Sequence, residues 1–170
     1  MPQGKLFIRT NGTKTAVGGQ NMTGLTNRTV NNNTYTGWAD AYLRYGLSLE
    51  DGALAALMAP APNKKPANVT PQSGHGTAYD GSTIGYKAER NISLDVHITA
   101  TNKSDYIEKY ALFCSEVLDC GYIQLRTSEQ PNVIYHLLYD ACQQFSHFLS
   151  GMAKFTLSLT EPHPDIRYDK

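Results

Sequence analysis

The stretch Ile92-Ser93-Leu94-Asp95-Val96-His97-Ile98-Thr99 decides the fold class of this chain. Apolar and polar side chains alternate along it, which is the pattern of a β-strand with one buried and one exposed face. A helix start follows at once, because Asn102 can cap a helix and Asp105 stands at the reciprocal third position of a capping box. A strand that leads directly into a helix predicts an α+β domain.

The predicted helix covers about 103–119 and is amphipathic. Its polar face is expected to turn Glu108, Lys109 and Glu116 to water, and Gly121 is expected to end it. The apolar residues that follow helical spacing are Ile107, Tyr110, Ala111, Cys114, Val117 and Leu118.

Three more strands are predicted after the helix. The first covers 122–127 and is ended by Pro131, the second covers 133–141, and alternation over 155–160 marks the third. Residues 90–161 therefore form a β-α-β-β-β core unit with the helix on one sheet face. Short connections favour antiparallel pairing of the last three strands.

The first half of the chain is less regular. Residues 11–37 are rich in Gly, Asn and Thr and cannot bury a core alone, so they are predicted to be a long loop with room for one weak hairpin. An arm that becomes ordered against a partner and plain surface disorder are equal alternatives for this segment. Residues 38–50 are predicted to form a strand. A short helix is predicted over 51–58, with Glu50 or Asp51 near its positive end.

A Pro- and Gly-rich irregular segment, 60–88, separates that helix from the core unit. At 170 residues the whole chain, 1–170, is expected to be a single domain. Its 15 basic and 15 acidic residues give no net charge that would attract nucleic acid or an anionic membrane. A protein that merely surrounds DNA does not need a basic surface. No apolar run reaches signal-peptide or membrane-span length, and the three cysteines are expected to be reduced.

Catalytic candidates are few. His97, His136 and His147 could converge in the fold, but they have no metal-ligand spacing. Cys142 lacks the flanking sequence of a nucleophile, and the chain contains neither a nucleophile elbow nor a framed phosphate-binding loop. We therefore expect no catalysis, no metal and no cofactor. A small ligand-binding domain or an enzyme that uses His97, His136 and Cys142 is the alternative from another class.

Tyrosine dominates the aromatic residues, with 11 Tyr against 5 Phe and 1 Trp. Tyrosine combines a large contact area with a polar tip and is enriched at interfaces. About half of these residues are expected to cover the core, and the rest favour an assembly role. The predicted interface residues are Asn21, Asn27, Asn32, Tyr35, Trp38, Tyr79 and Tyr86.

Several stretches resemble the tail proteins of long-tailed bacteriophages and prophages, especially the distal-tail type. The likeness covers about two-thirds of the chain and rests on patterns rather than on catalytic motifs. The stretches that carry it are Tyr45–Gly52, Ile92–Tyr110, Gly121–Arg126, Tyr139–Phe145 and Gly151–Pro162.

The resemblance implies a mainly antiparallel β-sandwich or small barrel, flanked by one helix and bearing long loops. It also implies a virion structural protein that closes a ring, with a hexamer expected, around the tail channel. The implied partners are tail-tube, tape-measure and tail-tip or baseplate proteins, with DNA only as passing cargo and no membrane. Such a protein would be made in the cytoplasm of a bacterial host and end in the virion tail.

The finer role stays open between a distal-tail or baseplate adaptor and a tail-tube or tail-terminator protein of the same fold. An adaptor of a contractile or secretion-like apparatus would look similar. By analogy with the long loops of this class, the segment 11–37 is where contacts between subunits or rings are expected.

Overall fold

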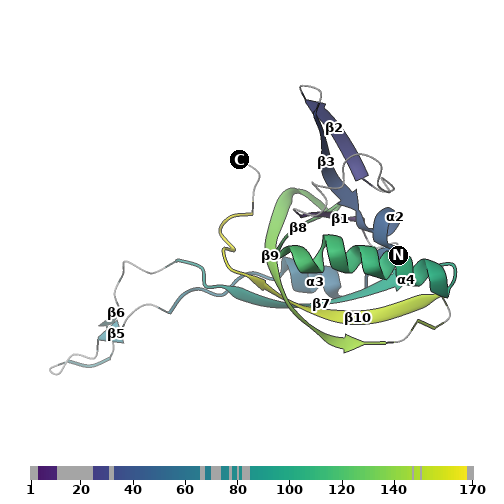
Figure 1. Ribbon diagram of the computed structural model, residues 1–170. Helices are drawn as coiled ribbons and strands as arrows, with labels where there is room; N and C mark the ends of the chain where they lie inside the picture. The colour runs from purple at the N-terminus through teal and green to yellow at the C-terminus, as the bar shows by residue number, and fades with distance from the viewer. Residues whose placement is uncertain are drawn as a thin grey trace.

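An eight-stranded antiparallel sheet forms the body of the protein (Figure 1). The computed structural model describes residues 4–10, 25–30, 33–65, 68–69, 74–76, 78–79, 81, 85–146, 148–149 and 151–167. The sheet order is β2-β3-β1-β8-β9-β10-β7-β4, and β5 and β6 form a separate two-stranded sheet. The strands are β1 (Leu6–Arg9), β2 (Leu25–Val30), β3 (Asn33–Asp40), β4 (Leu47–Leu49), β5 (Asn68–Val69), β6 (Ala78–Tyr79), β7 (Arg90–Thr99), β8 (Tyr122–Thr127), β9 (Gln130–Phe145) and β10 (Met152–Glu161).

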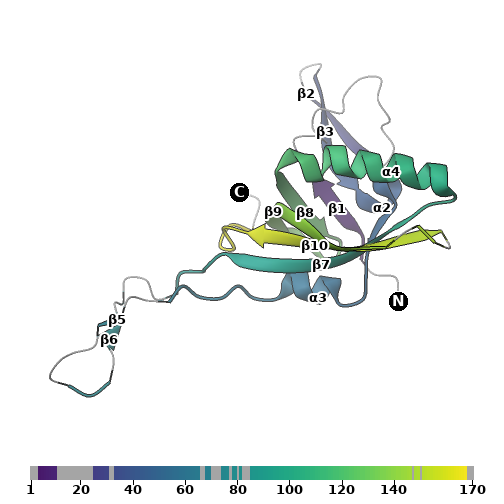
Figure 2. The same cartoon turned by 60° about the horizontal axis from the view of Figure 1, so that its bottom comes forward.

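The alternating strand is confirmed as β7. Buried and exposed residues alternate along it, and its buried side chains join one hydrophobic core with those of β10. The two strands pair without interruption from Thr99 opposite Met152 to Arg90 opposite Glu161. The predicted order of strand, helix and three strands is confirmed, and β8, β9 and β10 pair antiparallel. The sheet curls, and α4 (Lys103–Glu116) spans its open side (Figure 2).

The capping prediction for α4 is half correct. The side chain of Asn102 accepts a hydrogen bond of 2.9 Å from the backbone N–H of Asp105, as a helix cap does. The Asp105 carboxylate does not return to Asn102, however. It accepts a 2.9 Å bond from the N–H of Thr101 instead, one residue earlier, and it pairs with Lys109 at 3.1 Å.

The predicted apolar face of α4 is only partly correct. Val117, just after the helix, is buried, and Tyr110 and Leu118 are partly buried against the core. The helix buries Tyr106, Phe113 and Glu116, while Ile107 is 54% exposed and Ala111 is exposed as well. The centre of the buried face thus lies about 100° around the helix from the centre of the predicted one, since neighbouring residues on a helix differ by about 100°. Glu116, predicted to face water, is 7% exposed because it has buried partners.

Residues 38–50 do not form one strand. The strand β3 ends at Asp40, α2 (Ala41–Tyr45) follows, and β4 begins at Leu47. The Asp40 carboxylate accepts bonds from the N–H groups of Tyr42 and Leu43, and Gly46 at φ 65° ends the helix in the left-handed conformation. A side chain at Gly46 would meet the carbonyl oxygen of Thr99 at 2.3 Å, so glycine is required there.

The short helix predicted next is confirmed as α3 (Ala53–Met58). Gly52 stands at its N-cap without a side-chain bond, so neither Glu50 nor Asp51 caps it as such. The helix ends one residue before Ala59-Pro60, since the residue that precedes a proline is pushed out of helical conformation. A short 3-10 helix, η2 (Leu118–Cys120), continues α4 and ends at Gly121.

Several strand limits also differ from the prediction. Pro131 does not end regular structure, since β9 already begins at Gln130. The same strand runs on to Phe145, past the predicted end at residue 141. Register shifts beside Leu157 and Leu159 let this 16-residue strand bend across its partner β10.

Two β-hairpins leave the body of the molecule (Figures 1 and 2). The first is the β2–β3 hairpin, which begins within the predicted loop 11–37, ends at Asp40 and joins the sheet where β3 pairs with β1. Residues 11–24 and 31–32 of that segment lie outside the described residues. The second, residues 60–89, carries β5 and β6 far from the sheet and is called the projecting ribbon below.

Candidate functional site

The base of the β2–β3 hairpin is fixed by stacked side chains. Trp38 is half-buried, and the guanidinium groups of Arg9 and Arg126 lie 4.7 Å and 5.1 Å from its ring centre. Arg126 also lies 5.0 Å from the ring of Phe7. Contacts between cations and aromatic rings of this kind attach the hairpin to β1 and β8. Trp38, predicted as an interface residue, therefore has contacts within its own chain.

The other predicted interface residues are scattered over both hairpins. Asn27 and Tyr35 lie in β2 and β3, Tyr79 lies in β6, and Tyr86 lies on the ribbon with its side chain 61% exposed. Asn21 and Asn32 lie outside the described residues. The structure thus does not gather these residues into one surface, and their interface role stays a prediction.

A buried ion pair joins α2 to the end of α4. The Glu116 carboxylate accepts a 2.6 Å bond from Nε of Arg44 and a second bond from its Nη2, so the pair is bidentate. The hydroxyl of Tyr45 donates to the same carboxylate at 2.7 Å, and the hydroxyl of Thr10 donates to the backbone carbonyl of Glu116. Three segments far apart in the sequence therefore meet at one glutamate.

Burial and pairing shift the ionisation of this cluster. Burial alone would lower the pKa of Arg44, but the hydrogen bond and the charge of Glu116 raise that pKa overall. Burial raises the pKa of Tyr45, and its bond to Glu116 raises it further. The cluster therefore keeps one positive and one negative charge paired inside the protein. The periodicity of the sequence did not predict this cluster, because Arg44 and Glu116 look like surface residues of two separate helices.

A second buried carboxylate fixes the root of the projecting ribbon. Glu161, with no exposed surface, pairs with Arg90 at 2.7 Å and receives two 2.8 Å bonds from Arg167. Arg90 also donates to the carbonyl oxygens of Leu57, at 3.0 Å, and Ala59. The first residue of β7, the end of α3 and the segment after β10 are held together in this way.

Backbone bonds then keep the two sides of the ribbon together where it leaves the body. The N–H of Ala88 donates to the carbonyl of Pro62 at 2.8 Å, and the N–H of Lys64 donates to the carbonyl of Tyr86 at 2.7 Å. These bonds flank the antiparallel bridge between Asn63 and Lys87. Because bonded and outward-facing positions alternate along such a pair, the N–H and C=O of Asn63 point out of the ribbon.

The sheet has two open edges, β2 and β4, in its described part. Beside β4 lies a groove of about 450 Å³, which the N-terminal segment and α2 bound on the other side. The residues that line it are Gly4, Lys5, Leu6, Asp40, Tyr42, Leu43, Leu47, Ser48, Leu49, Glu50, Asp51 and His97. Tyr42 and Leu43 are more than half exposed there.

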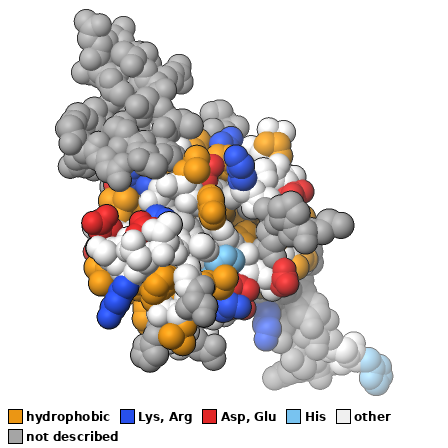
Figure 3. All heavy atoms as spheres, turned by 90° about the vertical axis from the view of Figure 1, so that its right-hand side faces the viewer, with side chains coloured by type: hydrophobic (Ala, Val, Ile, Leu, Met, Phe, Trp, Pro, Cys, Tyr) orange, Lys and Arg blue, Asp and Glu red, His pale blue; other side chains and the backbone are white. Residues whose placement is uncertain are grey.

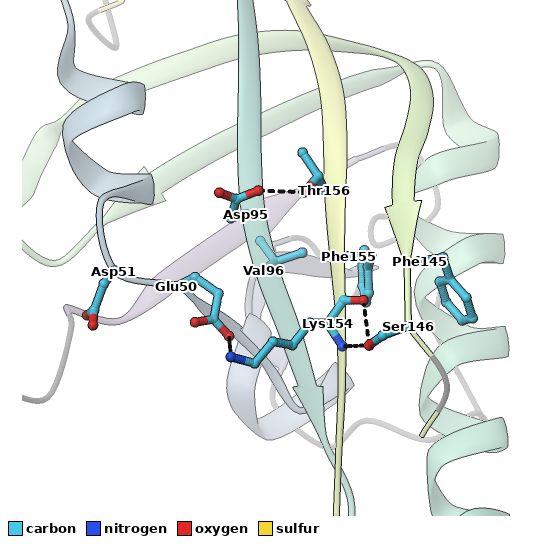
Figure 4. A pocket seen from close by; sticks show the side chains of 9 residues that line it. All are labelled: Glu50, Asp51, Asp95, Val96, Phe145, Ser146, Lys154, Phe155 and Thr156. Atoms are coloured by element: carbon cyan, nitrogen blue, oxygen red, sulfur yellow. Dashed lines mark hydrogen bonds and ion pairs between the residues drawn. The ribbon is translucent and has the colours of Figure 1, made fainter. Parts of the chain in front are cut away.

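A second hollow lies on the polar face of β7 and β10, next to the end of β4 (Figure 4). Glu50 pairs there with Lys154 at 3.4 Å and with Nδ1 of His97 at 2.8 Å. The Thr156 hydroxyl donates to Asp95 at 2.5 Å. Lys154 offsets only one of the three carboxylates that line the hollow, Glu50, Asp51 and Asp95, so the hollow is acidic.

The three candidate catalytic residues are not brought together. His97 lies on the polar sheet face opposite Lys154, whereas Cys142 pairs in register with Leu157, whose side chain belongs to the core face. His136 lies beside Gln124 of β8. By register it lies about eight positions along the strands from His97, roughly 25 Å at ~3.3 Å per residue. A site that uses all three residues is therefore excluded by geometry.

In the described ranges, no group of three or more His, Cys, Asp and Glu residues could hold a metal ion. No helix among the described residues is both long and apolar enough to cross a membrane. The face drawn in Figure 3 intersperses hydrophobic and charged side chains and presents no single broad patch of either kind.

Comparison with known proteins gives little further guidance. No protein-family model matches the chain, and no curated protein matches it. Among solved structures, it is similar to SPP1 Dit, described as a paradigm of the hub adsorption apparatus in phages that infect Gram-positive bacteria. The two share 14% sequence identity with a TM-score of 0.44 over 59% of this chain. The match spans 39% of the length of Dit, and a likeness of this extent establishes no shared function.

Proposed function

We propose that this chain is a structural component of a long bacteriophage tail and that it works by assembly, without a cofactor and without catalysis. The observation that carries the proposal is the pair of hairpins that leave a sheet with two open edges (Figure 1). Open edges present unpaired N–H and C=O groups, and protruding hairpins offer more of them to neighbours. The sequence resemblance to distal-tail proteins supports the same role.

The chemistry of the two edges supports closure into a ring. The edge strands β2 and β4 differ in length and sequence, so contact between two copies would join unlike surfaces. An interface of unlike surfaces is heterologous and closes into a ring when the rotation between copies allows. We take a hexamer as the working stoichiometry, with tail-tube, tape-measure and tail-tip or baseplate proteins as neighbours in the virion tail.

The absence of catalysis is part of the proposal. Its support is that the candidate set His97, His136 and Cys142 is dispersed and that the two conspicuous buried charge clusters are fully engaged inside the fold. In both clusters, the glutamate is bonded to arginine and has little or no contact with solvent. Such pairs define the fold rather than react with a substrate.

Electron microscopy of the purified protein and of assembled tails tests this function. We expect closed rings from the protein alone or with tube and tip proteins, and antibody labelling at the tail of the particle. A single ring at the tube end would favour the distal-tail adaptor, whereas stacked rings would favour a tube protein. A protein that stays monomeric at high concentration and joins neither tube nor tip proteins would contradict the proposal.

A further inference from the structure

The backbone of β4 carries outward-facing polar groups beside a groove. Gly46 accepts a bond from the N–H of Thr99, and Glu50 donates to the carbonyl of Asp95, so every second residue of this segment faces β7. Leu47 and Leu49 occupy the alternate positions, and their N–H and C=O groups therefore point toward the groove. β4 is the last strand in the sheet order, so no described strand pairs with that side of it, and both leucines belong to the hydrophobic core. Such an edge can pair with a strand from a partner.

The groove beside them is acidic at one end. Asp40, Glu50 and Asp51 line it, together with Lys5, which is 69% exposed and lies 3.9 Å from Asp40. Glu50 is also paired with His97 and Lys154, and Asp51 is the exposed carboxylate of this end. Glu50 and Asp51 also line the hollow shown in Figure 4, so the acidic end continues around the end of β4. A strand that enters the groove would bring its side chains next to these carboxylates.

The projecting ribbon carries the complementary chemistry. Its segment 62–65 reads Pro-Asn-Lys-Lys and is exposed throughout. The outer edge of this segment presents the N–H and C=O of Asn63, as the backbone bonds at the ribbon root require. Lys64 and Lys65 take part in no ion pair among the described residues, so both charges are available to carboxylates of a partner.

We infer that the open edge of β4 binds the segment 62–65 of a second copy of this chain, with Lys64 and Lys65 placed against Glu50 and Asp51. The segment would add as an extra strand, through backbone bonds to Leu47 and Leu49. This inference rests on the proposed assembly function and names the contact that would join one copy to the next.

The occupant must come from another copy. The ribbon root is fixed at Arg90, whereas β4 pairs with β7 at Val96 to Ile98, which lie six to eight positions further along that strand. At ~3.3 Å per residue this separation is on the order of 20–25 Å, and the ribbon extends away from the body (Figures 1 and 2). The segment 62–65 follows the root directly and cannot return to its own β4. The contact is thus heterologous, as ring closure requires.

Charge reversal on each side, followed by mixing, tests this contact. One variant carries Lys64→Glu with Lys65→Glu, and the other carries Asp51→Lys. All three positions are exposed, so both variants should fold, which circular dichroism and thermal unfolding would check. Sedimentation equilibrium at low salt should show each variant alone associating at least about tenfold more weakly than the wild type, because like charges then face each other across the interface.

An equal mixture of the two variants should recover association to near the wild-type level, since each basic surface then meets an acidic one. Lys103→Glu, an exposed change on α4, is the matched control and should associate like the wild type. If a charge-reversal variant does not fold or is insoluble, Lys64→Gln with Lys65→Gln removes the two positive charges instead. This variant should also associate more weakly than the wild type, and its association should depend less on salt.

Unchanged association in both variants, or no recovery on mixing, would overturn the inference. The proposed function would survive that result if rings still formed. A wild-type chain that neither self-associates nor joins tube and tip proteins would overturn both.

Discussion

Two buried glutamates, Glu116 and Glu161, join segments that are far apart in the sequence. Each is bonded to arginine through both carboxylate oxygens, and each lies where a helix or strand ends. Taking a charge out of water costs several kcal/mol, and the arginine and hydroxyl donors offset that cost only while all of them are present. A single change at such a residue is therefore expected to cost more than the loss of one contact.

Glu116→Gln should lower the free energy of unfolding by about 3 kcal/mol, because it leaves the Arg44 guanidinium buried without its counter-charge. Urea denaturation followed by circular dichroism measures this difference. The exposed Glu108→Gln on the same helix is the control and should stay within about 0.5 kcal/mol of the wild type. Equal effects of the two changes would mean that the buried pair contributes no more to the free energy of unfolding than an exposed glutamate does.

A tyrosine on α4 gives the protein a defined sensitivity to alkali. Burial raises the pKa of Tyr110 to about 12, and its hydrogen bond with Cys114 contributes in the same direction. An unfolded tyrosine loses its proton near pH 10, so the folded state binds more protons between about pH 10 and pH 12. Stability contributed by this group is present below pH 10 and is lost as pH rises through that window.

Tyr110→Phe should therefore reduce the fall in unfolding free energy between pH 9 and pH 11, as measured by urea titration at each pH. The exposed Tyr122→Phe is the control and should leave that fall unchanged. If Tyr110→Phe shows the same alkaline loss as the wild type, then this hydroxyl is not among the groups that cause it.

Local sequence signals predict some helices and strands of this protein and not others. The strand β7 was predictable because its alternation reports burial directly, and the Asn102 cap was predictable because the bond is local. The five-residue helix α2 was hidden inside an apolar stretch, although Asp40 and Gly46 were its start and stop signals. The face of α4 could not be predicted, since Phe113 and Glu116 are selected by Tyr45 and Arg44, about 70 residues earlier.

The same contrast applies to the candidate surfaces. The projecting ribbon coincides with the Pro- and Gly-rich segment 60–88, so its irregular composition was visible in the sequence. The open edge of β4 was not visible, because an edge is defined by the order of strands in the sheet and not by the strand itself. Long-range pairing thus decides which backbone groups remain available for partners.

Loss of the α4 cap gives a test at the level of one element. Asn102→Ala should lower the free energy of unfolding by about 1 kcal/mol, because the N–H of Asp105 loses its acceptor at the helix start. The neighbouring exposed change Lys103→Ala should have almost no effect. Equilibrium denaturation of both variants provides the comparison, and equal stabilities would show that the cap does not stabilise the helix.

At the scale of the whole molecule, the body and the projecting ribbon are separable. Every residue of the described hydrophobic core lies outside residues 60–89, and the ribbon is attached by backbone bonds and by the Arg90–Glu161 pair at its root. The body should therefore fold without the distal part of the ribbon, while assembly should depend on it.

Replacing residues 63–87 with Asn-Gly tests this separation, because that pair forms the tight turn that would join Pro62 to Ala88, which already share a backbone hydrogen bond. Thermal unfolding should show a body about as stable as the wild type, within about 1 kcal/mol. Electron microscopy should show no rings. Rings of normal size from the shortened chain would assign assembly to other surfaces, and an unfolded chain would show that the ribbon belongs to the folding unit.

The continuous pairing of β7 with β10 has a mechanical consequence. The ribbon passes directly into β7, and Figures 1 and 2 show the two running in nearly the same direction. A pull on the ribbon is thus applied along β7, so all ten residue pairs between Thr99 and Arg90 bear the load at once. Strands sheared in this way resist force far better than strands peeled apart one pair at a time. The root at Glu161 would then act as an anchor under tension.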